Sequence, residues 1–244
     1  MPLAGKICPP PSPRPLVVLH QDADLVAIDK PAGLLMHASA LDAHEALNAV
    51  DLLQAQRGER LFPLHRLDKA TSGVLLFGRS AASARHWGQA FEAGSPRKRY
   101  LALVRGWPDE RGEIDHCLAR DPERPSTGQP RVPAHTHYER LACFEWPFCA
   151  DSRHTTSRYA LLAIQPLSGR RHQIRRHFKH IAHPLVGDTT HGKGAHNRAV
   201  AQWLGWQRLW LHAQRLDLPM PDGNILRIEA PCGPEWAPLL AAVA

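Results

Sequence analysis

The sequence predicts an α+β fold with a mixed sheet, because strand-like segments outnumber helical ones, short hairpins recur and no internal repeat is present. With 244 residues, 43% of them hydrophobic, the chain can bury a core without disulfides. No apolar run approaches the roughly 18–20 residues of a membrane-spanning helix. The N-terminus also lacks the apolar segment of a secretory signal, so we expect a soluble, cytoplasmic protein.

The chain begins with a proline-rich stretch, followed by a hairpin pattern. Six of the first fifteen residues are proline, so we predict a flexible tail over 1–15 and one domain over 16–244. Residues 16–20 and 25–29 are strand-like and flank a short polar turn, which predicts a hairpin. Apolar residues at helical spacing then predict a helix that ends at Gly58.

Alternating strand and helix patterns continue to the C-terminus. A short buried strand at 74–77 is followed by Ser80, a good N-cap for a helix that runs to Gly94. The stretch 121–156 is rich in Pro, Ser, Thr and His, and only its middle, 136–143, resembles a strand. Strand patterns follow at 99–104 and 158–165, and a closing pair of strands is expected at 210–218 and 225–230. A helix is expected at 171–181, and Pro184 stops it.

Positive charge is concentrated in two places. The chain has 30 Lys and Arg against 23 Asp and Glu, and nine of the basic residues lie between Pro166 and Arg215, where Asp188 is the only acid. A second acid-free group contains Arg97, Lys98, Arg99 and Arg105. Clustered positive charge attracts polyanions, nucleic acid above all, and the alternative is a solvated basic face.

Several other patterns lack the context that their chemistry needs. Five scattered cysteines without a C-x-x-C indicate a reducing compartment and no thiolate zinc site. Residues 187–193 match the G-x-x-x-x-G-K of a phosphate loop, but Gly194 replaces its Ser or Thr and no strand precedes it. His177, His180 and His183 have a spacing that could bind a metal, but neighbouring Arg and Lys favour basic-face histidines, so we expect no metal.

One carboxylate stands out, in the segment HRLDKATSG at 65–73. Asp68 lies between Arg66 and Lys69, and both cations favour its ionised form. The Thr-Ser-Gly turn that follows leads directly into the buried strand. A loop ion pair is the alternative for this carboxylate.

HRLDKATSG resembles the catalytic signature H-R-L-D-x-x-T-S-G of the large ribosomal-RNA/tRNA pseudouridine synthase family. Four other segments resemble the family in its order: DKPAGL at 29–34, KRYLALVRG at 98–106, LSGRRHQIRRH at 167–177 and LHA at 211–213. The resemblance covers nearly the whole chain. It implies the pseudouridine synthase fold, with a central mixed, mostly antiparallel sheet, flanking helices and a catalytic cleft. Many members carry an S4-type RNA-binding domain, which we do not expect here because the pattern starts by Leu16.

The resemblance also implies roles for individual residues. Asp68 is the essential catalyst, Arg175 its ion-pair partner and Tyr100 the ring that stacks on the flipped-out uracil. The alternatives are a phosphate-binding Arg175 and a core Tyr100. Arg66 is expected to hold RNA, and Leu211 to pack against the base or in the core. The cations expected on RNA phosphates are Lys98, Arg99, Arg170, Arg171, Arg176 and Lys179.

The same resemblance implies a class of substrate. Residues 181–198 are most similar to a branch of the family that modifies uridine 65 of tRNA, so we expect a tRNA-modifying isomerase that acts as a monomer without cofactor or metal. Ribosomal RNA is the alternative substrate. A non-catalytic RNA-binding protein and a hydrolase that releases uracil are the alternatives from other classes.

Overall fold

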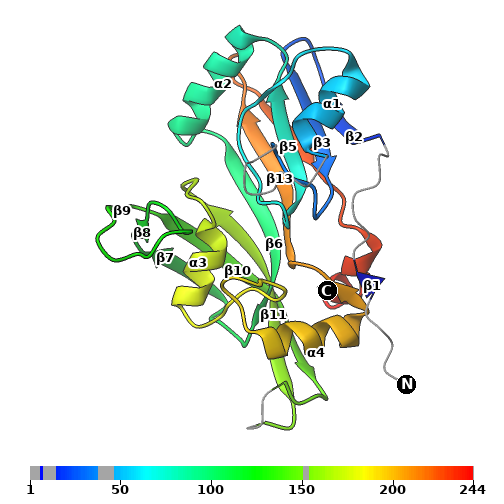
Figure 1. The fold of residues 1–244 in the computed structure, drawn as a ribbon, viewed down its shortest axis with the longest axis vertical. Coiled ribbons are helices and arrows are strands. Elements are labelled where there is room, and N and C mark those ends of the chain that lie inside the picture. The colour runs from blue at the N-terminus through cyan, green and yellow to red at the C-terminus, as the bar shows by residue number, and fades with distance from the viewer. Residues whose placement is uncertain (1–5, 8–14, 38–46, 151–153, 244) are drawn as a thin grey trace. The chain divides into compact units, whose positions relative to one another are not determined.

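The structure is a computed structural model that describes residues 6–7, 15–37, 47–150 and 154–243. The chain forms two compact units, each discontinuous in sequence. The Asp68 unit comprises Cys8–Lys98 and His212–Cys232, and the Arg175 unit comprises Met1–Ile7, Arg99–Leu211 and Gly233–Ala244. Figure 1 shows the helices and strands of both units. The single domain expected over 16–244 stays a prediction.

The Asp68 unit is built around β5, a strand whose seven residues are all buried. The β2–β3 hairpin is confirmed, and β3 pairs antiparallel with β5 along its whole length. The other edge of β5 is shared by β4, which is antiparallel, and β13, which is parallel. The mixed, mostly antiparallel sheet is therefore confirmed in this unit. Its elements are β2 (Val17–Gln21), β3 (Leu25–Lys30), α1 (Ala49–Arg57), β4 (Phe62–Pro63), β5 (Ser72–Gly78), α2 (Ala81–Glu92), β13 (Leu211–Pro219) and β14 (Ile225–Glu229).

The start of α2 and the end of α1 are as their predicted capping residues indicate. The Ser80 side chain accepts a hydrogen bond from the backbone N–H of Ser83 at the start of α2. Gly58 ends α1 in the left-handed conformation, with φ 67°.

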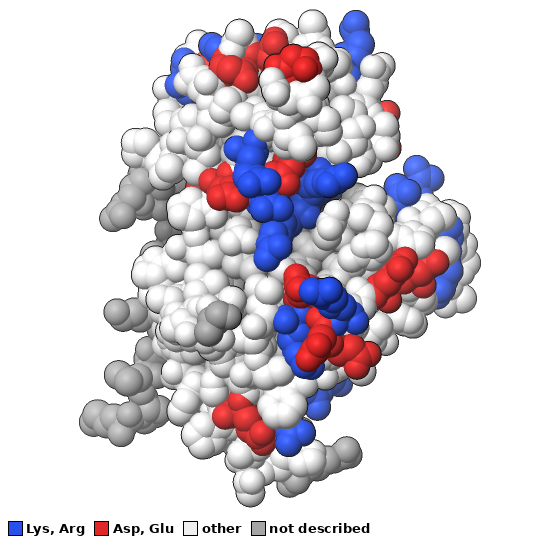
Figure 2. Space-filling model, turned by 180° about the vertical axis from the view of Figure 1, so that it is seen from behind, with Lys and Arg blue, Asp and Glu red and all other residues white. Residues whose placement is uncertain are grey.

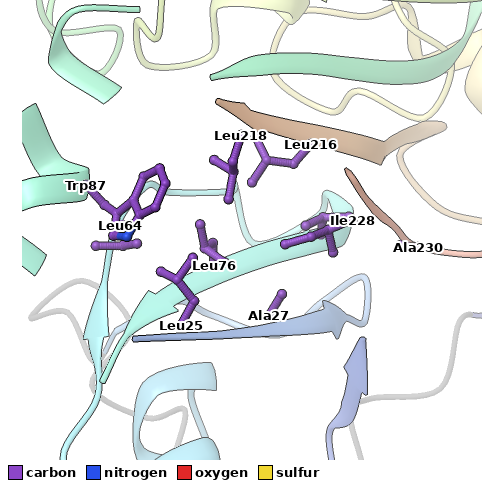
Figure 3. Close-up of a cluster of buried hydrophobic side chains, with 10 residues drawn as sticks. Leu25, Ala27, Leu64, Leu76, Trp87, Leu216, Leu218, Ile228 and Ala230 are labelled. Atoms are coloured by element: carbon purple, nitrogen blue, oxygen red, sulfur yellow. The ribbon is translucent and has the colours of Figure 1, made fainter. Parts of the chain in front are cut away.

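The core of the Asp68 unit lies on one face of the sheet. Side chains alternate along a strand, so Leu25 and Ala27 of β3 share a face with the corresponding residues of β5. Trp87 of α2 packs against this layer, with its ring only 4% exposed. Figure 3 shows these side chains pointing toward one another from β3, β5, β13, β14 and α2. The segment 65–73 leads into β5 of this sheet, whose first residue is Ser72.

The Arg175 unit contains an antiparallel sheet in the order β6-β11-β10-β7. Our prediction for the stretch 121–156 was too short, because β10 runs for twelve residues to Trp146. Trp146 packs on Tyr159 of the neighbouring strand, with ring centroids 4.7 Å apart, and this contact extends the pairing. The elements of this unit are β1 (Lys6–Ile7), β6 (Arg97–Arg105), β7 (Arg111–Asp115), β8 (Leu118–Ala119), β9 (Arg131–Val132), β10 (His135–Trp146), β11 (Ser157–Pro166), α3 (Gln173–His180), α4 (Gly194–Leu204), β12 (Trp206–Gln207), η2 (Pro234–Trp236) and α5 (Ala237–Leu240).

Two helices of this unit differ from expectation. Helix α3 begins two residues later than predicted, because His172 has a left-handed backbone with φ 54°. It ends before Pro184, because Ala182 has φ 64°. Helix α4 was not predicted, since its sequence GAHNRAVAQWL contains a glycine and few residues at clear apolar spacing.

Part of the predicted tail is ordered. Lys6 and Ile7 form β1, which pairs parallel with Trp206 and Gln207 of β12. Most of the remaining tail lies outside the described residues. Among the residues that the structure describes, no helix is long and apolar enough to cross a membrane.

Candidate active site

Asp68 lies in the loop between β4 and β5. Its side chain is half-buried, whereas the neighbouring Arg66 and Lys69 are exposed and Leu67 is buried. The backbone N–H of Thr71 donates to the carbonyl oxygen of Asp68 at 3.0 Å, which closes a tight turn. Leu67 and this turn therefore fix the backbone on both sides of the carboxylate.

A fully buried lysine, Lys30, also binds the backbone of the loop that contains Asp68. The Lys30 ammonium donates to the carbonyl oxygens of Pro31 at 2.9 Å, Leu34 at 2.8 Å and Lys69 at 3.1 Å. The backbone N–H of Gly33 donates to the same Lys69 carbonyl at 2.8 Å. A buried charge is tolerated only when its hydrogen bonds are made, and three carbonyls meet that need here. Lys30 thus joins the 30–34 turn to the residue that follows Asp68.

The start of β5 is held by a second buried polar contact. Ser72 Oγ lies 2.9 Å from His212 Nδ1, and His212 Nε2 lies 3.2 Å from the carbonyl oxygen of Ala230. The carbonyl can only accept, so Nε2 carries the proton and Nδ1 accepts from Ser72. Gly73 has φ 112°, and a Cβ there would overlap the backbone of Ala213. The close approach of β5 to β13 therefore requires this glycine.

Arg175, on α3, forms a buried ion pair with Asp188. Its Nε donates to Asp188 Oδ2 at 2.7 Å and its Nη2 to Oδ1 at 2.9 Å, and the two residues are 7% and 1% exposed. Burial raises the pKa of the Asp188 carboxyl, but hydrogen bonds and charge from Arg175 outweigh it, so the pKa lies below its ordinary value. The bidentate geometry fixes the plane of the guanidinium.

The loop that carries Asp188 is the one that resembled a phosphate loop. The backbone N–H groups of Thr190 and His191 donate to Asp188 Oδ1 at 2.9 and 2.8 Å. The N–H of Gly192 donates to the Asp188 carbonyl at 3.1 Å. These amides bind a carboxylate of the chain itself, which supports the rejection of a nucleotide site.

Gln173 fixes the first turn of α3, two residues before Arg175. Its side-chain oxygen accepts from Ser168 Oγ and from the backbone N–H of Arg170. Its amide nitrogen donates to the carbonyl oxygen of His135 at 2.8 Å and to Thr136 Oγ1 at 3.1 Å. The first turn of α3, which carries Arg175, is therefore tied to β10.

The three histidines at metal-like spacing have different surroundings. His177 is fully buried, correcting the basic-face interpretation for this residue, and contacts Thr136 Oγ1 at 2.9 Å and the His116 carbonyl at 3.1 Å. Burial lowers the pKa of His177 to about 4. His180 stacks on the His116 ring, and His183 Nδ1 lies 2.8 Å from the Arg105 carbonyl. No group of three metal-binding side chains gathers among the described residues.

Three of the arginines expected on RNA also hold part of the protein. Arg170 Nε donates to the Pro133 carbonyl at 3.1 Å, and Arg176 Nη1 donates to the Ala119 carbonyl at 2.9 Å. Arg171 forms an ion pair with Glu123. Figure 2 shows a face on which Lys and Arg lie among Asp and Glu instead of forming one unbroken patch. The acceptors of the three arginines all lie between residues 119 and 133.

The remaining predicted residues are placed as follows. Tyr100 is half-buried on β6, whereas its neighbour Leu101 is 1% exposed and Leu211 is 4% exposed. The Lys98 ammonium lies 5.3 Å from the centre of the Phe91 ring, and burial lowers the pKa of Lys98. Arg99 is half-buried and Lys179 exposed.

Asp68 and Arg66 belong to one unit, and Tyr100 and Arg175 to the other. The expected pairing of Asp68 with Arg175 therefore stays a prediction.

Sequence reasoning missed four positioning residues: Lys30, Gln173, Asp188 and His212. Asp188 had a usable signal, since it is the only acid in a long basic segment. Lys30, Gln173 and His212 lie inside the segments that carried the resemblance, but their partners are distant in sequence.

Comparison with known proteins agrees with the resemblance. A family model described as RNA pseudouridylate synthase matches residues 24–180. The tRNA pseudouridine synthase C of Haemophilus ducreyi is 43% identical over 210 residues, which cover 84% of this chain and 86% of that protein. The protein of the same name from Yersinia pestis is 40% identical over 232 residues, covering 93% and 90%. That of Vibrio cholerae is 41% identical over 232 residues, covering 93% and 95%.

Solved structures are similar in fold. Human RNA pseudouridylate synthase domain containing 1 aligns with a TM-score of 0.72 at 24% identity, over 92% of this chain and 86% of that one. Human RNA pseudouridylate synthase domain containing 4 aligns with a TM-score of 0.68 at 23% identity, over 93% and 92%. At this level of identity the likeness concerns the fold alone.

Proposed function

Because the chain belongs to the RNA pseudouridylate synthase family, we propose that it converts uridine to pseudouridine in tRNA, at uridine 65. The proposal of tRNA as the substrate rests on the identity of about 40%, over most of the chain, to proteins named tRNA pseudouridine synthase C. The net charge of +7 suits a polyanionic substrate.

The reaction is an isomerisation within one nucleotide. The bond between N1 of uracil and C1′ of ribose breaks, the base turns, and a new bond joins C1′ to C5. N1 gains a proton and C5 loses its hydrogen to solvent, so no electrons are exchanged with a co-reactant. For this reason we propose that the protein needs neither cofactor nor metal. We also propose that it acts as a monomer in the cytoplasm.

Asp68 is the proposed catalyst. It either attacks C1′ or removes a 2′ proton to give a glycal, and both routes use one carboxylate. The support from this chain is local: the loop of Asp68 is held by Lys30, by the turn to Thr71 and by the Ser72–His212 contact. A rigid loop keeps the carboxylate in one position while the base turns.

The other proposed roles come from the Arg175 unit. Tyr100 stacks on the target uracil, and its partial exposure on β6 leaves ring surface for this contact. Arg175 is the proposed ion-pair partner of Asp68, and Asp188 fixes the orientation of its guanidinium. Leu211 is proposed to pack near the base.

RNA binding is assigned to the basic side chains around these positions. Arg66 and Lys179 are exposed and suited to phosphate contacts. We include Lys98, Arg99, Arg170, Arg171 and Arg176 in the proposed RNA-binding set. Arg171 would exchange its contact with Glu123 for a phosphate. Arg171→Glu combined with Arg176→Glu is expected to raise the Kd for tRNA at fixed salt, because each removes a counter-charge for phosphate. An unchanged Kd in a folded variant would contradict this assignment.

The substrate is tested by mapping the product. A tRNA transcript with uridine at position 65 is incubated with the protein, and pseudouridine is located by primer extension after carbodiimide treatment. A transcript with cytidine at position 65 is the control. We expect one stop, at position 65, that is absent from the control. A stop elsewhere in tRNA would overturn the position, and modification of ribosomal RNA alone would overturn the substrate.

A further inference from the structure

A cluster of four basic side chains lies on the Arg175 unit, outside the catalytic residues proposed above. His116 precedes β8, Arg131 begins β9, and Arg176 and His180 belong to α3. The imidazoles of His116 and His180 are stacked, with centroids 3.7 Å apart and planes inclined by 15°. His180 and Arg131 are exposed, and His116 and Arg176 are half-buried, so the cluster is open to solvent.

The cluster has a defined geometry, because α3 is joined to the hairpin of β8 and β9 at two points. Arg176 Nη1 donates to the carbonyl oxygen of Ala119 at 2.9 Å. His177 contacts the carbonyl oxygen of His116 at 3.1 Å. Ala119 in turn is the register partner of Arg131. Figure 1 shows β8 and β9 beside α3. These contacts fix β8 and β9 against α3 and so bring the four basic residues to one part of the unit.

Positive charge in the cluster is not balanced by neighbouring acids. Burial and then the charges of His180, Arg131 and Arg176 lower the pKa of His116, and only Asp115 opposes them. Asp115 itself lies 3.0 Å from His135. Among the described residues, no ion pair joins Arg131, Arg176 or His180 to a carboxylate.

Mutually repelling groups that are held together are stabilised by an anion. An anion between them would offset the repulsion and favour protonation of an imidazole. His177, the other imidazole packed against the cluster, is buried with a pKa lowered to about 4 and stays neutral near pH 6. The imidazole that an anion would help to protonate is therefore that of His116, whose pKa is lowered by burial and by the neighbouring charges.

We propose that His116, His180, Arg131 and Arg176 form a binding site for an RNA backbone phosphate, and that binding couples to protonation of the His116 imidazole. The proposal deepens the proposed function, since it rests on RNA as the substrate. It places a contact of the RNA on the β8–β9 hairpin, to which sequence reasoning assigned no binding residue.

The coupling has a definite sign. If the complex holds one more proton than the separate partners, the Kd falls as the pH falls. The change approaches tenfold per pH unit between the lowered pKa of His116 in the free protein and its higher pKa in the complex. Above that pH range the His116 imidazole is neutral in either state, and the two arginines provide the positive charge.

The test measures the Kd for an unmodified tRNA transcript from about pH 5.5 to about pH 8 at constant salt. The variants are His116→Gln combined with His180→Gln, and Arg131→Gln alone. His86→Gln is the matched control, because His86 is an exposed imidazole on α2 in the other unit. Circular dichroism at each pH confirms that the proteins are folded.

We expect wild type and His86→Gln to bind several-fold more tightly at the acid end, and the double variant to lose most of this difference. Arg131→Gln should weaken binding throughout and reduce the slope of log Kd against log salt by about one. A pH dependence that is absent in wild type, or equal in the double variant, overturns the site.

Turnover separates this proposal from the proposed function. The control His86→Gln should keep the wild-type rate of tritium release from C5-labelled tRNA, whereas the double variant should need more tRNA to reach half of its maximal rate at the acid end. If wild type releases no tritium but shows His-dependent tRNA binding, the proposed function fails and the site stands. If tritium is released and the pH dependence is unaffected by the double substitution, the function stands and the site fails. Failure of wild type to bind tRNA at any pH overturns both.

Discussion

Replacing Asp188 by alanine should destabilise the protein strongly, because it removes the buried carboxylate that binds the guanidinium of Arg175 through two hydrogen bonds. The carboxylate accepts from two atoms of Arg175 and from two backbone N–H groups, and its side chain has no exposed surface. Removing one partner of such a buried pair costs about 3–5 kcal/mol. For a chain of this size each kcal/mol lowers the Tm by roughly 2–4 °C, so we expect a loss of about 6–20 °C.

The assay is urea unfolding at neutral pH, supported by thermal unfolding. Asp188→Asn keeps an oxygen for the backbone N–H groups of Thr190 and His191, so it should lose less free energy of unfolding than Asp188→Ala. Asp222→Ala is the matched control, because this exposed carboxylate bonds only within its own turn around Asn224, and its urea midpoint should equal that of wild type.

A double-mutant cycle with Arg175→Ala identifies the source of the effect. If the ion pair is responsible, the double variant should lose less free energy of unfolding than the sum of the single variants. The pKa of Asp188 lies below its usual value, so its contribution is present above about pH 4 and is lost as the pH falls through the lowered pKa. Additive losses, or a midpoint for Asp188→Ala equal to that of the control, would refute the reasoning.

Three further predictions concern other parts of the two units. Lys30→Met removes a donor from the carbonyl oxygens of Pro31, Leu34 and Lys69, of which that of Lys69 keeps the N–H of Gly33. We therefore expect a loss of roughly 1–3 kcal/mol in the free energy of unfolding measured in urea, and a wild-type midpoint would contradict this. Gly73→Ala should destabilise far more than Gly58→Ala, because both have positive φ but only Gly73 faces a backbone, that of Ala213; equal midpoints would contradict the close approach. Acid should lower the free energy of unfolding between about pH 6.5 and pH 4, because burial lowers the pKa of three histidines that must take up protons when the chain unfolds. Each histidine contributes up to about 1.4 kcal/mol per pH unit. A free energy of unfolding that is independent of pH over this range would contradict the prediction. These histidines are His65, His177 and His191.

Local patterns predicted most elements of the Asp68 unit. The β2–β3 hairpin and the ends of α1 and α2 depend on turn and capping residues within a few positions, so the sequence contains the whole signal. The Arg175 unit was predicted less well. The full length of β10 depends on Trp146 packing against a strand that follows an irregular segment, and α4 has a weak apolar pattern.

In the candidate site too, local patterns predicted some residues and not others. Asp68 and Tyr100 were predicted as site residues because short motifs carry them. The residues that hold the site rigid were not, because their partners are far away in sequence: Lys30 binds the carbonyl of Lys69, and His212 contacts Ser72. Such contacts depend on strand order, which no local pattern specifies.

The most direct test of the account is tritium release from tRNA labelled at C5 of uridine, comparing wild type with Asp68→Asn, which has nearly the same side-chain shape without the charge. Only bond formation at C5 displaces this tritium. We predict release by wild type and none by the variant, with both proteins folded and both able to bind tRNA. Release by the variant at the wild-type rate would contradict the assignment of Asp68 as the catalyst. Absence of release by wild type from both tRNA and ribosomal RNA would contradict the proposed reaction.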